Sequence, residues 1–333
     1  MTERLRVAVL GGGRSSEHDV SLRSAASVAD ALDPTRYEVI RITVERDGVW
    51  RDEAGGVVQV TPGGGGPLGA DVVFPALHGP FGEDGTVQGL LEMLDVAYVG
   101  SGVLGSSLTM DKDACKAMLR SHGFDVARDV VVAAGDDRDA AAARVAAELG
   151  YPVFVKPARL GSSIGISRVA DAGGLSAALD LALAHDAKAL VEELLDGEEV
   201  EVSVLGNDPA GLEASVVGRI GYASEWYDYE AKYGDGGSWL DAPADLPAAT
   251  ADAIRATALR AFAACDCRGM ARIDFFRTPE RVVLNEINTI PGFTATSYYA
   301  RMFEASGLPY PDLLDRLVAL ALERRAGDAT LRF

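Results

Sequence analysis

Two short segments in the last quarter of the chain carry the side chains best suited to chemistry. Gly269–Phe276 and Val282–Asn288 both alternate apolar and polar residues, and a turn around Pro279 joins them, so the pattern predicts a β-hairpin. Because side chains alternate along a strand, the polar side chains of each strand share a face. That face carries an arginine, two carboxylates and an amide, namely Arg272, Asp274, Glu286 and Asn288.

The spacing of these four residues predicts how they meet. A turn centred on Pro279 places Arg272 opposite Glu286, with Asp274 diagonal to it. A few hard oxygen ligands that leave room for water and phosphate suit a Mg²⁺ ion that bridges a nucleotide. A salt-bridged surface hairpin is the alternative, and the pattern alone favours it.

Three other segments favour the nucleotide interpretation. Gly292 follows a proline just beyond the second strand, and its unobstructed N–H suits an oxyanion. Lys156 ends a predicted strand and precedes a loop of small residues through Gly165, whose N–H groups could close over phosphates. Residues 227–233 combine tyrosines with charged side chains, as expected of a loop that closes on a site; an exposed aromatic loop is the alternative.

Two further motifs are misleading. Gly100–Gly105 matches the dinucleotide fingerprint, but it lies behind several predicted elements and only a short strand, so a tight turn is the better interpretation. Gly161–Gly165 matches the nucleophile elbow of hydrolases, yet the only histidine downstream is His185, on a predicted surface helix. No Gly-Lys pair occurs, which excludes a P-loop.

Composition limits the class of protein. The 333 residues predict about two domains, with three possible if they are small. With 31 Lys and Arg against 50 Asp and Glu, the net charge is −19, which disfavours nucleic acid and membrane partners. The N-terminal residues lack an apolar stretch long enough for a signal peptide, so a cytoplasmic location is expected.

Lysine and cysteine are both rare. The chain has three cysteines, which we expect to be reduced thiols, and it has five lysines, so most cations are arginines. The cysteines are Cys115, Cys265 and Cys267. The lysines are Lys112, Lys116, Lys156, Lys188 and Lys232.

The elements that position these residues begin with a strand, a glycine loop and a helix. Leu5–Leu10 alternates, three glycines follow it, and Ser16 with Asp19 fits a capping box that opens a helix through Leu32. Two more strands and a helix are predicted at Tyr37–Val44, Asp71–Leu77 and Thr86–Leu94. This alternation is typical of a parallel sheet with helices on its faces, so the fold class is α/β.

Later residues predict two further units. The second has helices at 111–121 and 139–149 and strands near Val130 and at 153–156. The third is rich in strands, at 200–205, 215–222, 270–276 and 282–287, with helices at 250–264 and 312–323. We therefore expect an N-terminal domain over 1–107, a central domain over 108–195 and a C-terminal domain over 196–333.

The order of the motifs resembles the D-alanine–D-alanine ligase family of the ATP-grasp superfamily. The resemblance covers almost the whole chain, and three of the five lysines lie within it. Its motifs are Gly11–Ser21, His78–Thr86, Met110–Lys112, Val155–Gly165, Tyr227–Tyr233, Arg272–Asp274 and Asn285–Ser297. It implies three domains, with ATP held between the central and C-terminal ones.

The resemblance assigns one set of residues to ATP and metal. Lys112 and Lys156 are expected to hold phosphates, Glu192 and Glu199 the adenine and ribose ends, and Lys232 also contacts ATP. Two Mg²⁺ ions, with Mn²⁺ as an alternative, are expected on Asp274, Glu286 and Asn288.

A second set is assigned to the amino acids. Glu17 pairs with the ammonium of the first D-alanine and is hydrogen-bonded to Ser162 and Tyr233, while Ser297 takes the carboxylate of the second D-alanine. His78 and Glu83 shape the first pocket, although a structural role for His78 is the alternative. Arg272 and the Gly292 N–H are expected to stabilise the oxyanion, and Tyr227 also contacts substrate.

The implied reaction makes D-alanyl-D-alanine for peptidoglycan precursors. ATP converts the first D-alanine to an acyl phosphate, because a carboxylate is a poor electrophile, and the amine of the second D-alanine then attacks. The group that accepts the amine proton stays open among Tyr233, Tyr227 and Ser162. The resemblance also implies a homodimer.

Two rival functions remain. One is a related ligase that makes D-alanyl-D-lactate or D-alanyl-D-serine. Residues Tyr227–Tyr233 resemble the closing loop of the D-alanine type, which favours the dipeptide over this rival. The other is a non-catalytic nucleotide-binding regulator on the same fold, which is expected to lose metal carboxylates, whereas Asp274 and Glu286 are both present.

Overall fold

The computed structural model describes residues 4–161, 164–222 and 238–332, and the N-terminal part of these forms a mainly parallel sheet. β1 pairs in parallel with β2 and β4, β4 pairs in parallel with β5, and β3 is antiparallel to β2. The strands are β1 Leu5–Gly12, β2 Tyr37–Val44, β3 Trp50–Asp52, β4 Val72–Pro75 and β5 Ala97–Tyr98, in the order β3-β2-β1-β4-β5. With α1 (His18–Ala31) after β1 and α2 (Thr86–Leu94) after β4, this confirms the predicted parallel α/β unit.

The start of α1 differs from the predicted capping box. The N-cap residue is Glu17, and its side chain makes no capping hydrogen bond. The nearby serine that bonds locally is Ser15, whose Oγ accepts from the Glu17 N–H at 3.2 Å and donates to the His78 carbonyl at 2.7 Å. The prediction that Ser16 and Asp19 cap this helix is therefore wrong, because Ser15 ties the turn to the neighbouring loop instead.

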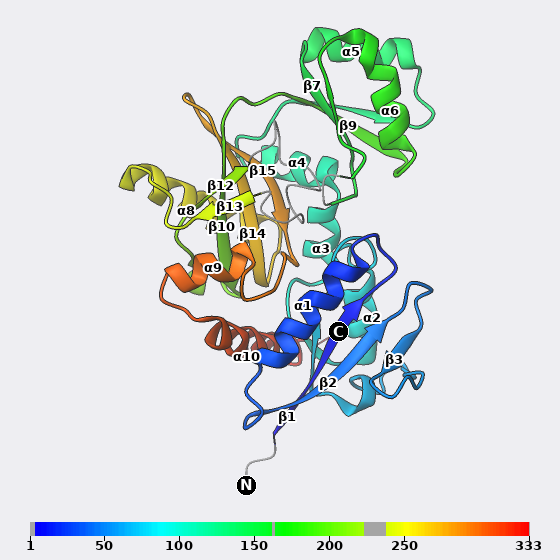
Figure 1. Ribbon diagram of the computed structural model, residues 1–333, viewed down its shortest axis with the longest axis vertical. Coiled ribbons are helices and arrows are strands. Elements are labelled where there is room, and N and C mark those ends of the chain that lie inside the picture. The colour runs from blue at the N-terminus through cyan, green and yellow to red at the C-terminus, as the bar shows by residue number, and fades with distance from the viewer. Residues whose placement is uncertain (1–3, 162–163, 223–237, 333) are drawn as a thin grey trace.

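The second sheet forms a separate lobe in the upper part of Figure 1, with α5 and α6 packed against it. Its strands pair antiparallel in the order β6-β9-β7-β8. They are β6 Asp129–Ala133, β7 Val153–Pro157, β8 Ser167–Val169 and β9 Lys188–Glu193, and the helices are α5 Arg138–Glu148 and α6 Leu175–Leu183. Apolar residues of these helices, including Val145 and Leu179, pack with Val155 and Val191 to form its core.

Two helices, α3 (Val103–Met110) and α4 (Lys112–Ser121), connect the first sheet to the second. α3 begins within the Gly100–Gly105 run and only a bend at Gly100 precedes it, so the expectation of a tight turn is wrong. Gly105 lies inside α3, where a Cβ would come within 2.6 Å of the Asp266 carbonyl oxygen. Because Gly105 has no side chain, α3 can pack closely against the backbone at Asp266. This packing explains the glycine without any dinucleotide.

The third sheet is antiparallel and occupies the middle of Figure 1. Its strands are β10 Glu198–Gly206, β11 Glu213–Ala214, β12 Gly218–Tyr222, β13 Ser238–Asp241, β14 Gly269–Arg277 and β15 Val282–Asn288. The order is β13-β12-β10-β14-β15, with β11 beside β10. α8 (Ala248–Ala264) packs on β10 and β14 through Ile254, Ala258 and Phe262.

The predicted β14–β15 hairpin is confirmed, but its register differs from the prediction. Arg272 lies opposite Asn288 and Asp274 opposite Glu286. The pairing then shifts at a bulge between Asp274 and Phe275, which leaves Asn285 without a partner residue. Arg272 therefore pairs two residues further along β15 than in a hairpin centred on Pro279. The bulge accounts for one residue and the turn, where Arg277 pairs with Val282, for the other; a shift of two keeps the polar side chains on one face.

The last two helices connect the third sheet to the first. They are α9 (Tyr298–Ala305) and α10 (Tyr310–Asp328), and Figure 1 shows α10 next to α1. Leu313 and Leu317 of α10 share one core with Val7 and Phe74 of the first sheet. The N-terminal and C-terminal units are therefore packed together around common apolar residues; the predicted domain boundaries at 107 and 195 stay predictions. Short 3₁₀ turns occur at Pro67–Gly69, Ala172–Gly174 and Pro209–Gly211.

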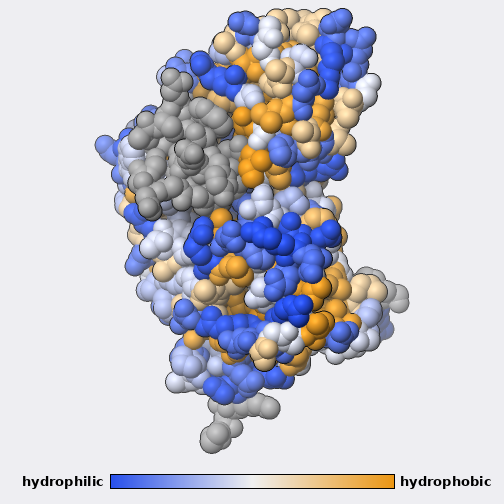
Figure 2. Space-filling model, turned by 45° about the vertical axis from the view of Figure 1, so that its right-hand side comes forward, coloured by the Kyte–Doolittle hydropathy of each residue, from blue (hydrophilic) through white to orange (hydrophobic). Residues whose placement is uncertain are grey.

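The surface is mixed in polarity. Figure 2 shows hydrophilic side chains across the middle of the visible face, with apolar areas separated by polar ones. Within the described ranges, no helix has the length and apolar character needed to span a bilayer.

Candidate active site

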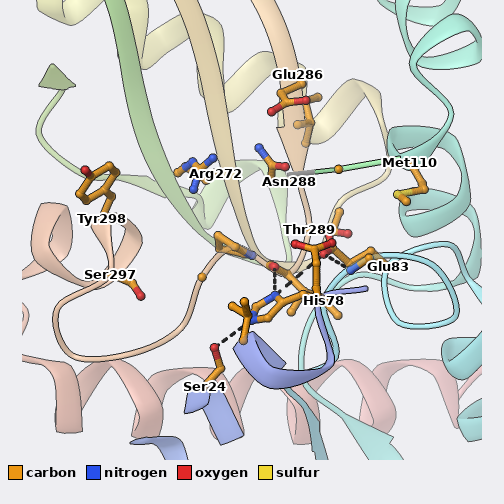
Figure 3. Close-up of a pocket in the computed structure, with 18 of the residues that line it drawn as sticks. Ser24, His78, Glu83, Met110, Arg272, Glu286, Asn288, Thr289, Ser297 and Tyr298 are labelled. Atoms are coloured by element: carbon orange, nitrogen blue, oxygen red, sulfur yellow. Dashed lines mark hydrogen bonds and ion pairs between the residues drawn. The ribbon is translucent and has the colours of Figure 1, made fainter. Parts of the chain in front are cut away.

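A cavity of about 370 Å³ lies where the N-terminal unit meets the third sheet. The start of α1, the loop after β4, the end of α3, Gly161, the end of β15 and the segment after β15 line it (Figure 3). The predicted site residues on its wall are Glu17, His78, Glu83, Lys112, Arg272, Glu286, Asn288, Gly292 and Ser297. Segments far apart in the sequence thus meet at one cavity.

Glu17 lines this cavity and is almost fully buried, at 5% exposure. Gly79 has a positive φ of 77°, and a Cβ at this position would come within 2.5 Å of Glu17 Oε2. A Cβ on Gly161 would lie 3.5 Å from the same oxygen. Gly79 therefore makes room for this carboxylate, whereas a side chain at Gly161 would only be in ordinary contact with it. A buried carboxylate on a cavity wall suits recognition of an ammonium group.

His78 is buried and makes two hydrogen bonds that fix its tautomer. Its Nδ1 lies 2.9 Å from the Ile290 carbonyl oxygen, which can only accept, so Nδ1 carries the proton. Its Nε2 then accepts from the Ser24 hydroxyl at 2.8 Å. Burial lowers the pKa of His78, which agrees with a neutral ring. The imidazole therefore links α1 to the segment after β15 (Figure 3).

Glu83 is the second titratable group in this part of the cavity. Its Oε1 accepts from the Gly79 N–H at 2.8 Å, and the same oxygen lies 3.9 Å from His78 Nδ1, beyond hydrogen-bond range. Burial, with the nearby charge of Glu17, raises the pKa of Glu83 to about 8. The carboxyl is therefore protonated near neutral pH and keeps a second negative charge away from Glu17.

Arg272 faces the cavity from β14 and is held by two carboxylates. Its Nε and Nη2 donate to Asp274 Oδ1 and Oδ2 at 2.8 and 2.7 Å, and its Nε also lies 3.1 Å from Glu201 Oε2. Glu201 is 2% exposed and lies opposite Asp274 on β10. The sequence analysis missed Glu201, although a glutamate between Val200 and Val202 in a predicted strand was a signal for a buried, paired carboxylate.

The expected metal ligands lie together on β14 and β15. Asp274 and Glu286 are directly opposite each other, and Asn288 Nδ2 donates to Asp274 Oδ2 at 2.9 Å. Among the described residues no larger group of His, Cys, Asp and Glu could hold a metal. The two carboxylates, with the amide turned to present its oxygen, fit Mg²⁺, which binds through few protein oxygens and keeps positions for phosphate and water.

The segment after β15 is held by one of its own hydroxyls and by two hydroxyls of α1. Ser297 Oγ accepts from the Thr294 N–H at 2.9 Å, and its Cβ lies 3.8 Å from where a Cβ on Gly292 would be. Ser24 Oγ lies 3.4 Å from the Phe293 N–H, and Ser27 Oγ accepts from the Ala295 N–H at 3.3 Å. These bonds hold the Gly292 and Ser297 region against α1.

Lys112, at the first position of α4, also lines the cavity. Its Nζ donates to the Leu160 carbonyl at 2.9 Å and lies 3.6 Å from Glu286 Oε2. It therefore links the loop after β7 to Glu286, one of the expected metal ligands.

Some predicted residues lie away from the cavity. Lys156 on β7 and Glu192 on β9 are paired in a buried cluster, with Lys156 Nζ 2.5 Å from Glu192 Oε2. Glu199 lies on β10 opposite Phe276, two residues before Glu201 and so on the same face of the sheet. A contact of Glu192 with adenine stays a prediction, because in this structure its carboxylate binds lysines. Ser162, Tyr227, Lys232 and Tyr233 lie outside the described residues.

The fold and this site define the class. An antiparallel sheet bearing paired carboxylates, a separate lobe carrying lysines and a parallel N-terminal sheet together form the architecture of ATP-grasp enzymes. Two family models match the chain: "D-ala D-ala ligase N-terminus" over residues 6–63 and 55–101, and "D-ala D-ala ligase C-terminus" over residues 118–319. The chain belongs to the D-alanine–D-alanine ligase family.

Full-length relatives agree with this assignment. D-alanine–D-alanine ligase A of Mesorhizobium japonicum is 48% identical over 355 residues, covering 97% of this chain and 99% of that protein. D-alanine–D-alanine ligase of Deinococcus radiodurans is 47% identical over 339 residues, covering 96% and 99%.

Two solved structures have the same fold. The D-alanine–D-alanine ligase of Coxiella burnetii superposes with a TM-score of 0.89 at 34% identity, over 98% of this chain and 97% of that one. The VanG D-Ala:D-Ser ligase of Enterococcus faecalis gives 0.87 at 35% identity, over 96% and 100%. The fold thus serves ligases that differ in their second substrate, and the chain is itself a ligase.

Proposed function

We propose that this chain joins two D-alanines to D-alanyl-D-alanine, with ATP converted to ADP and phosphate, to supply peptidoglycan precursors. One observation carries the proposal: the buried Glu17 carboxylate, the Arg272 guanidinium and the Lys112–Glu286 pair all face one cavity. An ammonium, an oxyanion and a metal-bound phosphate are the groups that these side chains would recognise.

The first half-reaction activates a carboxylate. Glu17 would hold the ammonium of the first D-alanine, so that its carboxylate points toward Lys112 and the end of the hairpin. That carboxylate attacks the terminal phosphorus of ATP, the bond to ADP breaks, and D-alanyl phosphate forms. Lys112 and Lys156 would offset charge on the phosphates. Asp274, Glu286 and Asn288 would hold Mg²⁺, which supplies further positive charge at the transferred group.

The second half-reaction forms the amide bond. Ser297 would bind the carboxylate of the second D-alanine, whose amine, after losing a proton, attacks the acyl carbon and expels phosphate. The tetrahedral intermediate carries an oxyanion, for which Arg272 and the Gly292 N–H are the donors. Asp274 and Glu201 hold the guanidinium, so little reorganisation accompanies the reaction. The proton acceptor is proposed among Ser162, Tyr227 and Tyr233.

His78 and Glu83 have a different role in this proposal. The neutral His78 binds Ser24 and the Ile290 carbonyl, and the protonated Glu83 binds the Gly79 N–H. They would keep the loop after β4 in place around Glu17 and the first D-alanine. Glu199 and Lys232 are proposed to bind the nucleotide.

A D-serine-accepting ligase is the second candidate, because VanG, a D-Ala:D-Ser ligase, shares the fold at a similar TM-score. The D-alanine product is favoured because the relatives that are 47–48% identical are named D-alanine–D-alanine ligases. We also propose that the metal is Mg²⁺, that the chain forms a homodimer and that it is located in the cytoplasm.

The test measures ADP release by the full chain with Mg²⁺ and ATP. The amino-acid arms are D-alanine alone, D-alanine with D-serine, D-alanine with D-lactate, and L-alanine, and mass spectrometry identifies each product. Release with D-alanine alone, with the dipeptide formed, is expected. Turnover only in a mixed arm would overturn the second substrate but keep the ligase chemistry. Bound ATP without turnover in any arm would favour a regulator.

A further inference from the structure

Two lysines lie outside every motif used above, and both tie helix α4 to strand β9. Lys188 on β9 lies 2.7 Å from Asp111 Oδ1 and 2.8 Å from Asp113 Oδ2, at the start of α4. Lys116, in the middle of α4, pairs with Glu192 on β9. The two differ in burial, because the Lys188 side chain is 23% exposed and the Lys116 side chain 2%.

Lys116 belongs to a buried cluster of three charged groups. Glu192 receives Lys116 at Oε1 and Lys156 at Oε2, so each lysine has its own carboxylate oxygen. The three residues come from α4, β9 and β7 and are 1%, 5% and 7% exposed for Lys116, Glu192 and Lys156. Interactions at this burial are only weakly screened by solvent.

With two lysines and one glutamate, the cluster has a net charge of +1 when all three groups are ionised. Burial opposes ionisation of Glu192, but Lys116 and Lys156 together lower the pKa of Glu192 to about 2. Burial lowers the pKa of Lys116 to about 8, which still leaves it charged near neutral pH. One ammonium suffices to neutralise one carboxylate, so the other is available to an anion.

Position shows which lysine is available. Lys156 lies at the end of β7, and the loop that follows reaches Gly161 on the cavity wall. Neither lysine lines the cavity itself, but Lys116 lies in the middle of α4 beside β9, with no loop that leads from it to the cavity. Breaking a buried pair by removing its only partner is strongly destabilising, so Lys156 can leave Glu192 only if another cation remains there.

We propose that Lys116 is a positioning residue for nucleotide binding: it remains the counter-ion of Glu192 and so allows Lys156 to turn to a phosphate of ATP. The inference rests on the proposed phosphate role of Lys156. Without Lys116, Lys156 would be the sole partner of a buried carboxylate, and ATP would have to compete with Glu192 for it.

The main test is Lys116→Met in the full chain, with affinity measured by calorimetry. The probe is the ATP analogue with an imido bridge between the β- and γ-phosphates, in the presence of Mg²⁺. We expect the analogue to bind at least tenfold more weakly and the KM for ATP to rise in parallel, while the KM for D-alanine at saturating ATP changes less than twofold. Lys116→Arg, which keeps the charge, is expected to stay within threefold of the original affinity. Unchanged affinity in Lys116→Met would overturn the inference.

A double-mutant cycle separates this role from a merely structural one. In a Glu192→Gln background no carboxylate holds Lys156, so adding Lys116→Met is expected to change analogue affinity less than threefold. Both proteins in this comparison carry Glu192→Gln, so the result does not depend on any contact of Glu192 with adenine. A tenfold loss in that background as well would overturn the inference. If Lys116→Met does not fold, Lys116→Gln takes its place with the same expectations.

Two controls complete the design. Lys188→Met also breaks an α4–β9 ion pair but leaves the cluster intact, and its affinity for the analogue is expected to stay within threefold of the original. A loss of affinity equal to that of Lys116→Met would point to loosening of α4 and overturn the inference.

Lys156→Ala tests the proposed function itself. Unchanged analogue affinity there would refute the phosphate role of Lys156, whereas weak binding by Lys156→Ala with normal binding by Lys116→Met would refute the Lys116 inference alone.

Discussion

The proposed amino-acid side and the proposed nucleotide side of this enzyme are built in different ways. On the amino-acid side, Glu17, His78 and Arg272 come from distant segments and meet at an open cavity. On the nucleotide side, Lys116, Lys156 and Glu192 form a closed cluster of ion pairs inside one lobe and its connecting helix.

The difference shows what each side must do. Small amino acids are recognised by a few fixed polar groups, so the first side needs a rigid cavity whose walls hold one another, as His78 does between α1 and the segment after β15. The triphosphate brings several negative charges, so the second side needs cations that are stable without it. Substitutions on the two sides should therefore change different kinetic constants.

The largest effect is expected from Arg272→Ala. Loss of an oxyanion donor lowers kcat by ~10²–10³ in other enzymes, and we expect a fall of about this size with little change in ATP affinity. Steady-state kinetics with ATP and with D-alanine varied separately measure both constants. The control is Arg277→Ala on the same strand, whose partner Glu198 is half-exposed; it should stay within twofold. Normal turnover in Arg272→Ala would remove this side chain from the mechanism.

Glu17→Gln should weaken the first amino-acid site. Removing one charge of a buried ion pair costs at least ~2 kcal/mol, which is about a 30-fold rise in KM for the first D-alanine, with the KM for ATP unchanged. Initial rates over a wide range of D-alanine concentration resolve the two sites. Asp19→Asn, on the same helix but with its side chain 71% exposed, serves as the control. D-alanine saturation identical to that of the unaltered chain would contradict the role of Glu17.

Gly79→Ala tests the space around the same carboxylate. The new methyl group would lie 2.5 Å from Glu17 Oε2, so the carboxylate must move, and we expect the KM for the first D-alanine to rise about tenfold. Gly123→Ala is the matched control, because Gly123 has a similar φ of 75° and no atom within 4 Å of the added Cβ. An equal effect of both substitutions would attribute the change to backbone conformation.

The smallest effect concerns acid stability on the nucleotide side. Lys116 and Lys156 lower the pKa of Glu192 from 4.5 to about 2 against the effect of burial, so ionised Glu192 stabilises the folded state fully above pH 4.5 and loses this contribution as the pH falls toward 2. The Tm difference between the unaltered chain and Glu192→Gln should therefore be largest near pH 7 and fall by at least half by pH 3. Glu148→Gln, at an exposed i,i+4 pair, should show no such trend. A Tm difference that does not change with pH would show that the charge of Glu192 does not stabilise the folded state.

The hairpin illustrates how far sequence reasoning reached. Strand alternation correctly grouped Arg272, Asp274, Glu286 and Asn288 on one face, because that grouping depends only on a period of two. The partner of Arg272 was missed by two residues, one from the bulge at Asp274 and Phe275 and one from the turn, because neither leaves a mark in the alternating pattern. Glu201 was missed because its role depends on a third strand, β10, beside the hairpin.

The sequence by itself determined the order of the motifs, the family and the chemistry of most site residues, because residue type and local spacing specify donors, ligands and strand faces. Only the tertiary structure decided that Lys116 and Lys156 share Glu192 and that α10 packs with the first sheet. It also decided that the Glu17 carboxylate lies against the backbone of Gly79. Each of these contacts joins residues far apart in the chain. Such contacts depend on how the sheets and helices pack around a common core, which local spacing does not encode.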